Sequence, residues 1–147
     1  MPELLTLLLR IAGAGLLSLA LVHIPIGRHL KWREDCARLT PVNESIFHVH
    51  AFFICLVLVM MGLPCLFDPR VFVETSRAGL WLAWSFSAFW TIRLYFQWFV
   101  YRAELWRGKR METSMHWTFS FIWAGLAVLF AACGAWQMGW FPQQQLN

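Results

Sequence analysis

The chain has 147 residues, of which 59% are hydrophobic and 14% are charged. Soluble domains usually carry about 25% charged residues, so this composition argues against a soluble globular domain and favours an integral membrane protein. The net charge of +4 would suit a nucleic-acid-binding protein, but the basic residues lie between apolar segments, where membrane topology places them. We therefore expect membrane lipids as partners and no nucleic acid. No nucleophile motif, phosphate-binding loop or dinucleotide-binding fingerprint is present.

Four apolar segments are long enough to cross a membrane, and they lie at residues 4–26, 41–63, 79–101 and 114–139. A hydrocarbon layer of about 30 Å needs about 20 helical residues, and a helix satisfies its own backbone hydrogen bonds in lipid. Glu3 stands where a signal peptide has basic residues, so the first segment is interpreted as a retained span. The predicted fold is an all-α, four-helix transmembrane bundle with short loops, forming a single domain over residues 1–147.

The second span carries its own boundary signals. Thr40 and Pro41 fit a helix cap followed by proline at the first helical position, where its missing N–H is not needed. Gly62 and Pro64 are residues that commonly end helices. We therefore expect this helix to begin at Pro41 and to end near residue 63.

The basic residues predict the direction of the spans. Loop one (residues 27–40) and loop three (residues 102–113) hold eight of the twelve Lys and Arg residues. Because Lys and Arg gather in cytoplasmic loops, these loops should be cytoplasmic and both termini should lie outside, in a multi-pass protein of the inner (plasma) membrane. In loop one, Trp32, Cys36 and Leu39 recur at helical spacing, which predicts a short helix lying in the membrane interface.

Small and polar residues fall on one face of each later span. Such stripes mark helix–helix contacts, because lipid gives no other reason to group them. The predicted inward faces are Glu44, His48, Ala51, Cys55 and Gly62 in the second span; Gly79, Ala83, Phe86, Trp90, Arg93, Gln97 and Tyr101 in the third; and Thr113, His116, Ser120, Ala127, Ala131 and Gly134 in the fourth. In the first span His23 shares a face with Ala12, Leu16 and Ala20.

Three of these inward residues are histidines at a similar depth. His23, His48 and His116 each lie within about one turn of the cytoplasmic end of their span. Arg93 precedes Tyr101 by eight residues, which is about 12 Å along a helix. A charge at that depth is unfavourable unless it has a partner or faces water. The pattern predicts a polar site near the cytoplasmic leaflet.

The sequence His48-Val49-His50 resembles a metal chelate, but its spacing argues against one. On a helix, residues two apart point in directions about 200° apart, so both rings cannot face one ion. We expect His50 to be a packing or snorkelling residue on the lipid side.

One hypothesis for the polar site is a metal ion or a haem. His48, His116 and His23 would supply imidazole nitrogens and Glu44 a carboxylate, a set that suits zinc, iron or copper. Two of the histidines would alternatively hold a haem iron. Arg93 counts against haem, because it lies deeper than the histidines whereas haem propionates normally face water.

A second hypothesis is a site for a lipid-soluble ligand such as a quinone or a lipid headgroup. Arg93 and Gln97 would orient the ligand, Tyr101 would donate a hydrogen bond, and a histidine would move protons.

The third hypothesis is structural. Arg93 would pair with Glu44, and the protein would be a non-catalytic subunit or an assembly factor of a membrane complex. Its partners would be other membrane subunits or a second copy of the chain. The sequence leaves these three hypotheses open.

Overall fold

The computed structural model describes residues 1–29 and 31–141, and only the backbone of residues 28 and 29. Every regular element in these residues is helical, which confirms the predicted all-α class. The elements are α1 (Pro2–His29), α2 (Trp32–Cys36), α3 (Pro41–Phe67), α4 (Arg70–Val73), α5 (Arg77–Phe99), the 3-10 helix η1 (Ala103–Leu105) and α6 (Arg110–Gln137). The C-terminal tail, predicted to lie outside the membrane, falls almost wholly beyond the described residues.

Three helices in the described residues are long and apolar enough to cross a membrane: α1, α3 and α6. They support membrane association of the chain. α5 has 23 residues, but tryptophan, serine, Arg93 and Gln97 make it less apolar than the other three. The predicted four-helix bundle is therefore supported in its coarser form, as a helical protein with three apolar helices of membrane-spanning length.

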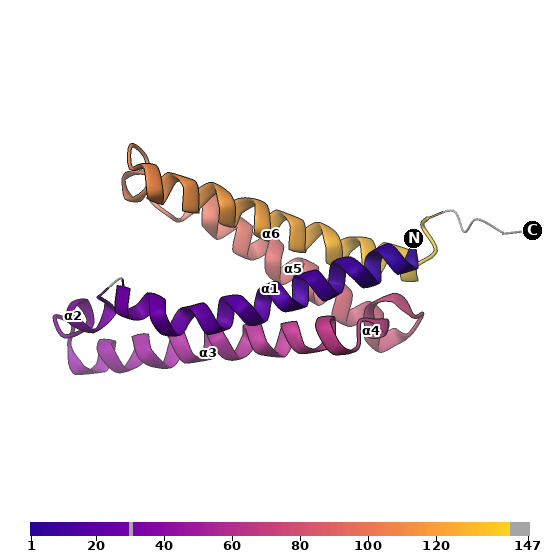
Figure 1. Cartoon of the computed structure of the whole chain (residues 1–147), viewed down its shortest axis with the longest axis horizontal. Helices are drawn as coiled ribbons and strands as arrows, with labels where there is room; N and C mark the ends of the chain where they lie inside the picture. The colour runs from indigo at the N-terminus through magenta and orange to yellow at the C-terminus, as the bar shows by residue number, and fades with distance from the viewer. Residues whose placement is uncertain (30, 142–147) are drawn as a thin grey trace, which may run out of the picture. The chain divides into compact units, whose positions relative to one another are not determined.

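The chain divides into two compact units. Residues Leu7–Pro69 form the first, called here the α1–α3 unit, and Met1–Thr6 with the residues from Arg70 onwards form the second, called the α5–α6 unit. In the α1–α3 unit, α2 lies in the connection between its two long helices, at the dark end of Figure 1. The predicted short helix in loop one is thus confirmed as a helix.

Two glycines set the contact between α1 and α3. A Cβ atom on Gly13 would lie 2.6 Å from the backbone nitrogen of Leu66 and 2.8 Å from the carbonyl oxygen of Gly62. A Cβ atom on Gly62 would lie 3.0 Å from Cγ of Leu17. Small residues let two helix backbones approach closely, and here only the missing side chains make the approach possible.

The boundaries of α3 follow the sequence at one end only. Thr40 caps the helix, because its Oγ1 accepts a hydrogen bond from the backbone N–H of Asn43 at 3.4 Å, and Pro41 is the first helical residue. The predicted end was wrong, because α3 continues past Gly62 and through Pro64 to Phe67. Gly62 is a packing residue rather than a stop signal.

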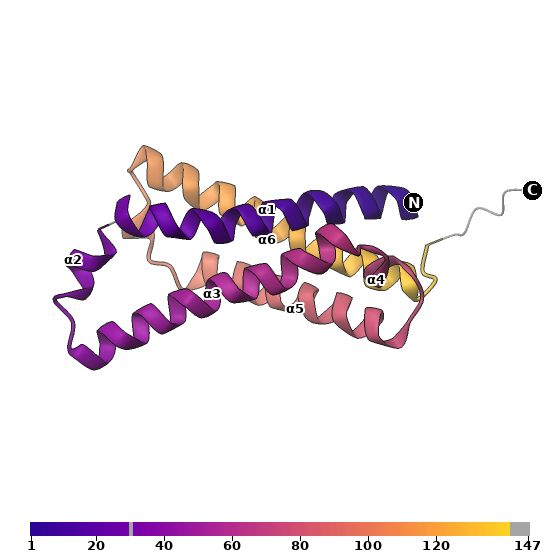
Figure 2. The same cartoon turned by 60° about the horizontal axis from the view of Figure 1, so that its bottom comes forward.

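The α5–α6 unit is an antiparallel hairpin with α4 packed across it where α5 begins and α6 ends (Figure 2). The buried Ser87 hydroxyl on α5 donates to the carbonyl oxygen of Ala127 on α6 at 3.0 Å. Gln137 closes the same end of the hairpin, since its Nε2 donates to the carbonyl oxygen of Phe72 at 2.9 Å and its Oε1 accepts from the N–H of Ser76 at 3.3 Å. These bonds fix the register of α5 against α6.

The glycine contact in the α1–α3 unit can be tested by adding a single methyl group. Gly13→Ala should destabilise the full-length protein by about 1–3 kcal/mol, because the new Cβ overlaps backbone atoms of α3 that cannot move independently. The measurement is thermal unfolding in detergent. Gly15→Ala is the matched control, because a Cβ at Gly15 meets nothing within 4 Å and alanine favours a helix. Equal unfolding temperatures for the two variants would contradict the proposed contact.

Candidate functional site

The residues predicted to bind a metal are divided between the two units. His23, His48 and Glu44 belong to the α1–α3 unit, whereas His116 belongs to the α5–α6 unit. Among the residues that the structure describes, no group of three or more His, Cys, Asp or Glu side chains is placed to hold a metal ion. The predicted histidine cluster and metal site are therefore not supported.

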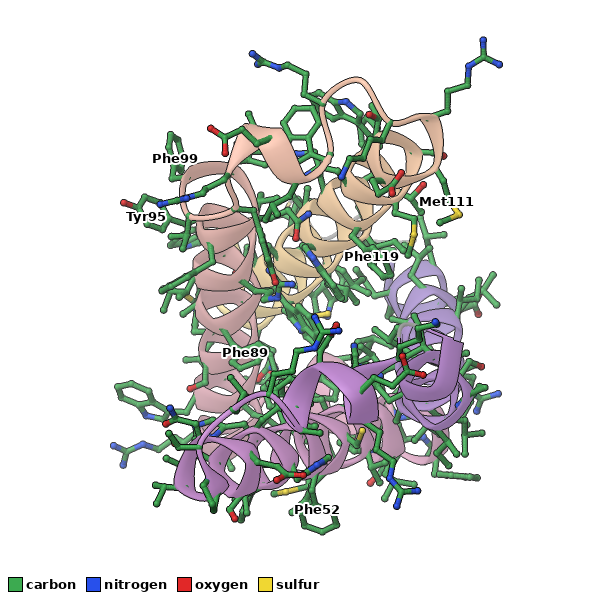
Figure 3. All side chains as sticks on the ribbon, turned by 90° about the vertical axis from the view of Figure 1, so that its left-hand side faces the viewer. Phe52, Phe89, Tyr95, Phe99, Met111 and Phe119 are labelled. Atoms are coloured by element: carbon green, nitrogen blue, oxygen red, sulfur yellow. The ribbon has the colours of Figure 1, made fainter. Side chains whose placement is uncertain are left out.

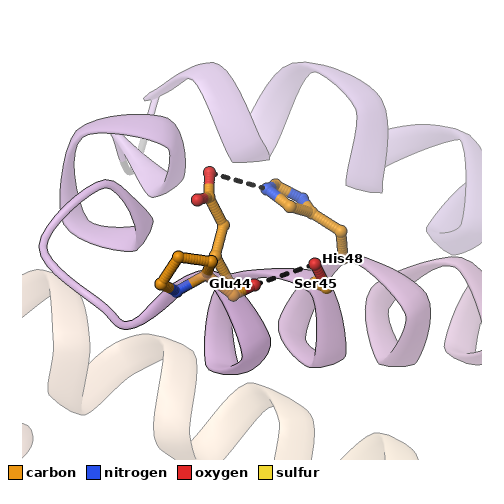
Figure 4. A network of polar contacts seen from close by, with 4 residues as sticks. Glu44, Ser45 and His48 are labelled. Carbon is orange, nitrogen blue, oxygen red and sulfur yellow. Dashed lines mark hydrogen bonds and ion pairs between the residues drawn. The ribbon is translucent and has the colours of Figure 1, made fainter.

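Glu44 and His48 form a local pair on the first turns of α3 (Figure 4). Glu44 Oε1 lies 3.9 Å from His48 Nε2, and both side chains are about half exposed. They are one helical turn apart, and such an exposed pair contributes little to stability. Ser45 beside them donates to the carbonyl oxygen of Pro41 at 2.8 Å, so this group is satisfied within its own helix end.

His23 and His50 are also bound to their own helices. His23 Nδ1 donates to the carbonyl oxygen of Leu19 at 2.7 Å, and His50 Nδ1 donates to that of Ile46 at 2.8 Å. A carbonyl oxygen only accepts, so the proton of each ring lies on Nδ1. His50 is exposed, in agreement with its predicted packing role, and both rings are held back by the preceding helical turn.

The α5–α6 unit, in contrast, joins three of the predicted residues in one network. Nη1 of Arg93 donates to Oε1 of Gln97 at 3.2 Å, and Nε2 of Gln97 lies 3.1 Å from Nδ1 of His116. Arg93 and Gln97 meet because they are four residues apart on α5, and His116 reaches them from α6. We call these three residues the Arg93–Gln97–His116 triad.

The chemistry of arginine fixes the direction of every hydrogen bond in this triad. Arginine has no acceptor, so the oxygen of Gln97 must face it. The amide NH2 of Gln97 then faces His116, whose Nδ1 must accept. His116 is therefore a neutral imidazole with its proton on Nε2, and no described residue is a hydrogen-bond partner of that Nε2–H. Metal coordination needs the lone pair that this proton occupies.

Aromatic rings enclose the triad. The His116 ring stacks on Trp106, with centroids 4.2 Å apart and planes 8° from parallel. Cζ of Arg93 lies 5.6 Å from the ring centre of Tyr101 and 5.2 Å from that of Trp123. Such cation–π contacts hold a guanidinium group in place. Gln97 and His116 are 7% and 8% exposed, so the triad is shielded from its surroundings on most sides.

The guanidinium group lies closer to the end of α5 than the position of Arg93 suggests. Tyr101 follows Arg93 by eight residues, or about 12 Å along a helix, yet its ring centre is only 5.6 Å from Arg93 Cζ. The side chain thus extends past Gln97 toward loop three, as long cationic side chains do near a membrane interface. The sequence overestimated the depth of this charge because it counted residues and ignored the reach of the side chain.

No carboxylate neutralises this charge among the described residues of the α5–α6 unit. The ion pairs in the described chain join Glu34 to Lys31 and Glu44 to His48. The predicted pairing of Arg93 with Glu44 would join two units, so it stays a prediction.

Buried hydrogen-bond donors around the triad are also unpartnered. The indole N–H groups of Trp90, Trp106 and Trp123 are buried and have no acceptor among the described residues. Trp90 stacks on Trp123, with centroids 4.8 Å apart. A buried donor without an acceptor costs about 1–3 kcal/mol. Sequence analysis missed Trp106 and Trp123, because they do not stand out among ten tryptophans; the four-residue steps from His116 to Ser120 and Trp123 were the available signal.

No family model matches the chain, and no curated protein or solved structure matches it either. Function is therefore inferred from the geometry of this site. The structure brings together Arg93, Gln97, Tyr101 and His116 of the predicted residues, and it does not add His23, His48 or Glu44 to them within one unit.

The role of Gln97 can be tested by two substitutions at one position. Gln97→Leu should lower stability by about 1–3 kcal/mol, because it leaves the Arg93 and His116 nitrogens without their partner. Gln97→Glu should keep the unfolding temperature close to that of the unmodified chain, since a carboxylate accepts from both neighbours. Thermal unfolding in detergent measures both effects, and Tyr95→Phe, an exposed change on the same helix, is the control. A fully stable Gln97→Leu protein would show that the triad contributes nothing to the fold.

Proposed function

We propose that the chain is a four-span membrane protein in which α5 provides the fourth span. α5 has 23 residues, about 35 Å at the helical rise, which is long enough to cross the hydrocarbon layer. Tyr95 and Phe99 project from α5 away from α6, as Figure 3 shows, and both are largely exposed, as expected for a lipid-facing surface. The basic loops would be cytoplasmic, with both termini outside.

This topology can be tested with epitope tags at the two ends of the full-length chain. External protease should remove both tags from spheroplasts with intact membranes, because four spans place the two ends on the same side. A cytoplasmic protein digested only after lysis is the control. Removal of one tag alone would mean an odd number of spans, and α5 would then be the helix that fails to cross.

We further propose that the α5–α6 unit binds the polar head of a lipid-soluble ligand, a quinone or a lipid headgroup. The observation that carries this proposal is the direction of the Arg93–Gln97–His116 triad. Its two ends present donors only: the remaining N–H groups of Arg93 and the Nε2–H of His116. Tyr101 adds a third donor at the exposed edge. A ligand that matches this site must therefore offer hydrogen-bond acceptors.

The test is to identify what remains bound to the full-length protein after purification in a mild detergent. Lipid extraction and mass spectrometry should detect a retained quinone or lipid. In His116→Phe the amount retained should fall about tenfold, the effect of losing roughly 1.4 kcal/mol of hydrogen bonding. Phenylalanine keeps a flat ring against Trp106 but has no N–H. His50→Phe is the matched control, because His50 bonds only to its own helix.

Other outcomes of the same experiment would contradict the proposal. A Soret absorbance band or a stoichiometric metal ion that disappears in His116→Phe would favour the haem or metal hypothesis. Equal retention of the ligand in both variants would separate binding from the triad. Loss of a partner complex in His116→Phe, with retention unchanged, would favour the subunit or assembly-factor hypothesis.

A further inference from the structure

We infer that the ligand of this site is an anionic phospholipid whose phosphate group contacts Arg93. This inference rests on the proposed function and names the ligand that the same site would take. It distinguishes an anionic head from the neutral carbonyl oxygens of a quinone.

The first argument is the charge on Arg93. Its printed hydrogen bond is the one to Gln97, and its contacts with Tyr101 and Trp123 are to ring faces. These contacts orient the guanidinium group but bring no full negative charge, and no carboxylate of the described α5–α6 unit supplies one. A planar guanidinium group with free N–H donors binds an oxyanion through two parallel hydrogen bonds. A phosphate group supplies both the oxygens and the missing charge.

The second argument is the number of donors. Three buried indole N–H groups lack an acceptor in the described chain, and each ring belongs to the cluster around the triad. Trp123 contacts Arg93, Trp106 stacks on His116, and Trp90 stacks on Trp123. A phosphate group has several acceptor oxygens and satisfies more of these donors than a single carbonyl oxygen does.

The third argument identifies a lipid as the source of the phosphate. The guanidinium group extends toward loop three, where Arg102, Arg107, Lys109 and Arg110 are all exposed. Basic residues at this level attract anionic headgroups. The exposed apolar surface of α5 beside the triad, including Tyr95 and Phe99 in Figure 3, is suited to acyl chains. A headgroup near the loop with its chains along α5 uses both features.

The experiment measures lipid binding to the full-length protein in detergent by native mass spectrometry, with phosphatidylglycerol and phosphatidylcholine as probes. We expect phosphatidylglycerol to bind at least tenfold more tightly. Arg93→Gln should reduce its binding to the level of phosphatidylcholine, whereas Arg93→Lys, which keeps the charge but not the planar fork, should retain part of the preference. Arg77→Gln is the matched control, because Arg77 is exposed at the opposite end of α5.

Several results would overturn the inference. These are equal binding of the two lipids, an unchanged preference in Arg93→Gln, or full competition by inorganic phosphate, which would show that no lipid is needed. Circular dichroism checks that Arg93→Gln is folded, and Arg93→Lys serves as the test if it is not. Decylubiquinone separates the two proposals: if it binds in a manner that depends on His116 while the lipid preference is absent, the proposed function stands and this inference fails. If neither probe binds, both fail.

Discussion

The α5–α6 unit depends on how the amide of Gln97 bridges a cation and an imidazole. A guanidinium group on an apolar helix is tolerated only when its N–H groups find acceptors or its charge reaches a polar layer. Gln97 gives Arg93 one acceptor, and the long side chain carries the charge toward loop three. Because arginine can only donate, the amide has one possible orientation, which sets the tautomer of His116. The choice of one residue thus determines that the site donates hydrogen bonds rather than coordinating a metal.

The position of the triad is set by contacts at the far end of the hairpin. Gln137 binds the backbone of the α4–α5 connection, and Ser87 binds the carbonyl oxygen of Ala127 in the middle of α6. Both bonds fix how α5 lies along α6, so that His116 falls opposite Gln97. Hydrogen bonds between helices are rare in an apolar hairpin and correspondingly specific, because a sliding movement would leave each donor without an acceptor. Packing elsewhere is less selective.

Sequence patterns gave the helices, the Thr40–Pro41 cap and most of the buried face of α5. They failed where the outcome depends on side-chain reach or on a partner far along the chain. Pro64 was taken as a stop, but it lies in the last turn of α3, where one lost hydrogen bond is tolerated. The histidines were grouped by depth alone, although a ring bound to the carbonyl oxygen four residues earlier is turned toward its own helix. Neither this bond nor the tautomer of His116 can be read from spacing.

Unpartnered donors close to an unneutralised charge are energetically unfavourable for the chain by itself, since each buried N–H without an acceptor loses its hydration without replacement. Three indole groups and one guanidinium group share this condition in a single cluster. Apolar rings of similar size at Trp90 and Trp123 would fill the same volume without the unsatisfied N–H groups, so close packing alone does not account for these residues. A ligand rich in acceptors removes the deficit, and it then stabilises the folded hairpin in proportion to its binding. On this view the stability of the α5–α6 unit and its occupancy are one equilibrium, and the aromatic cluster is a binding surface as much as a core.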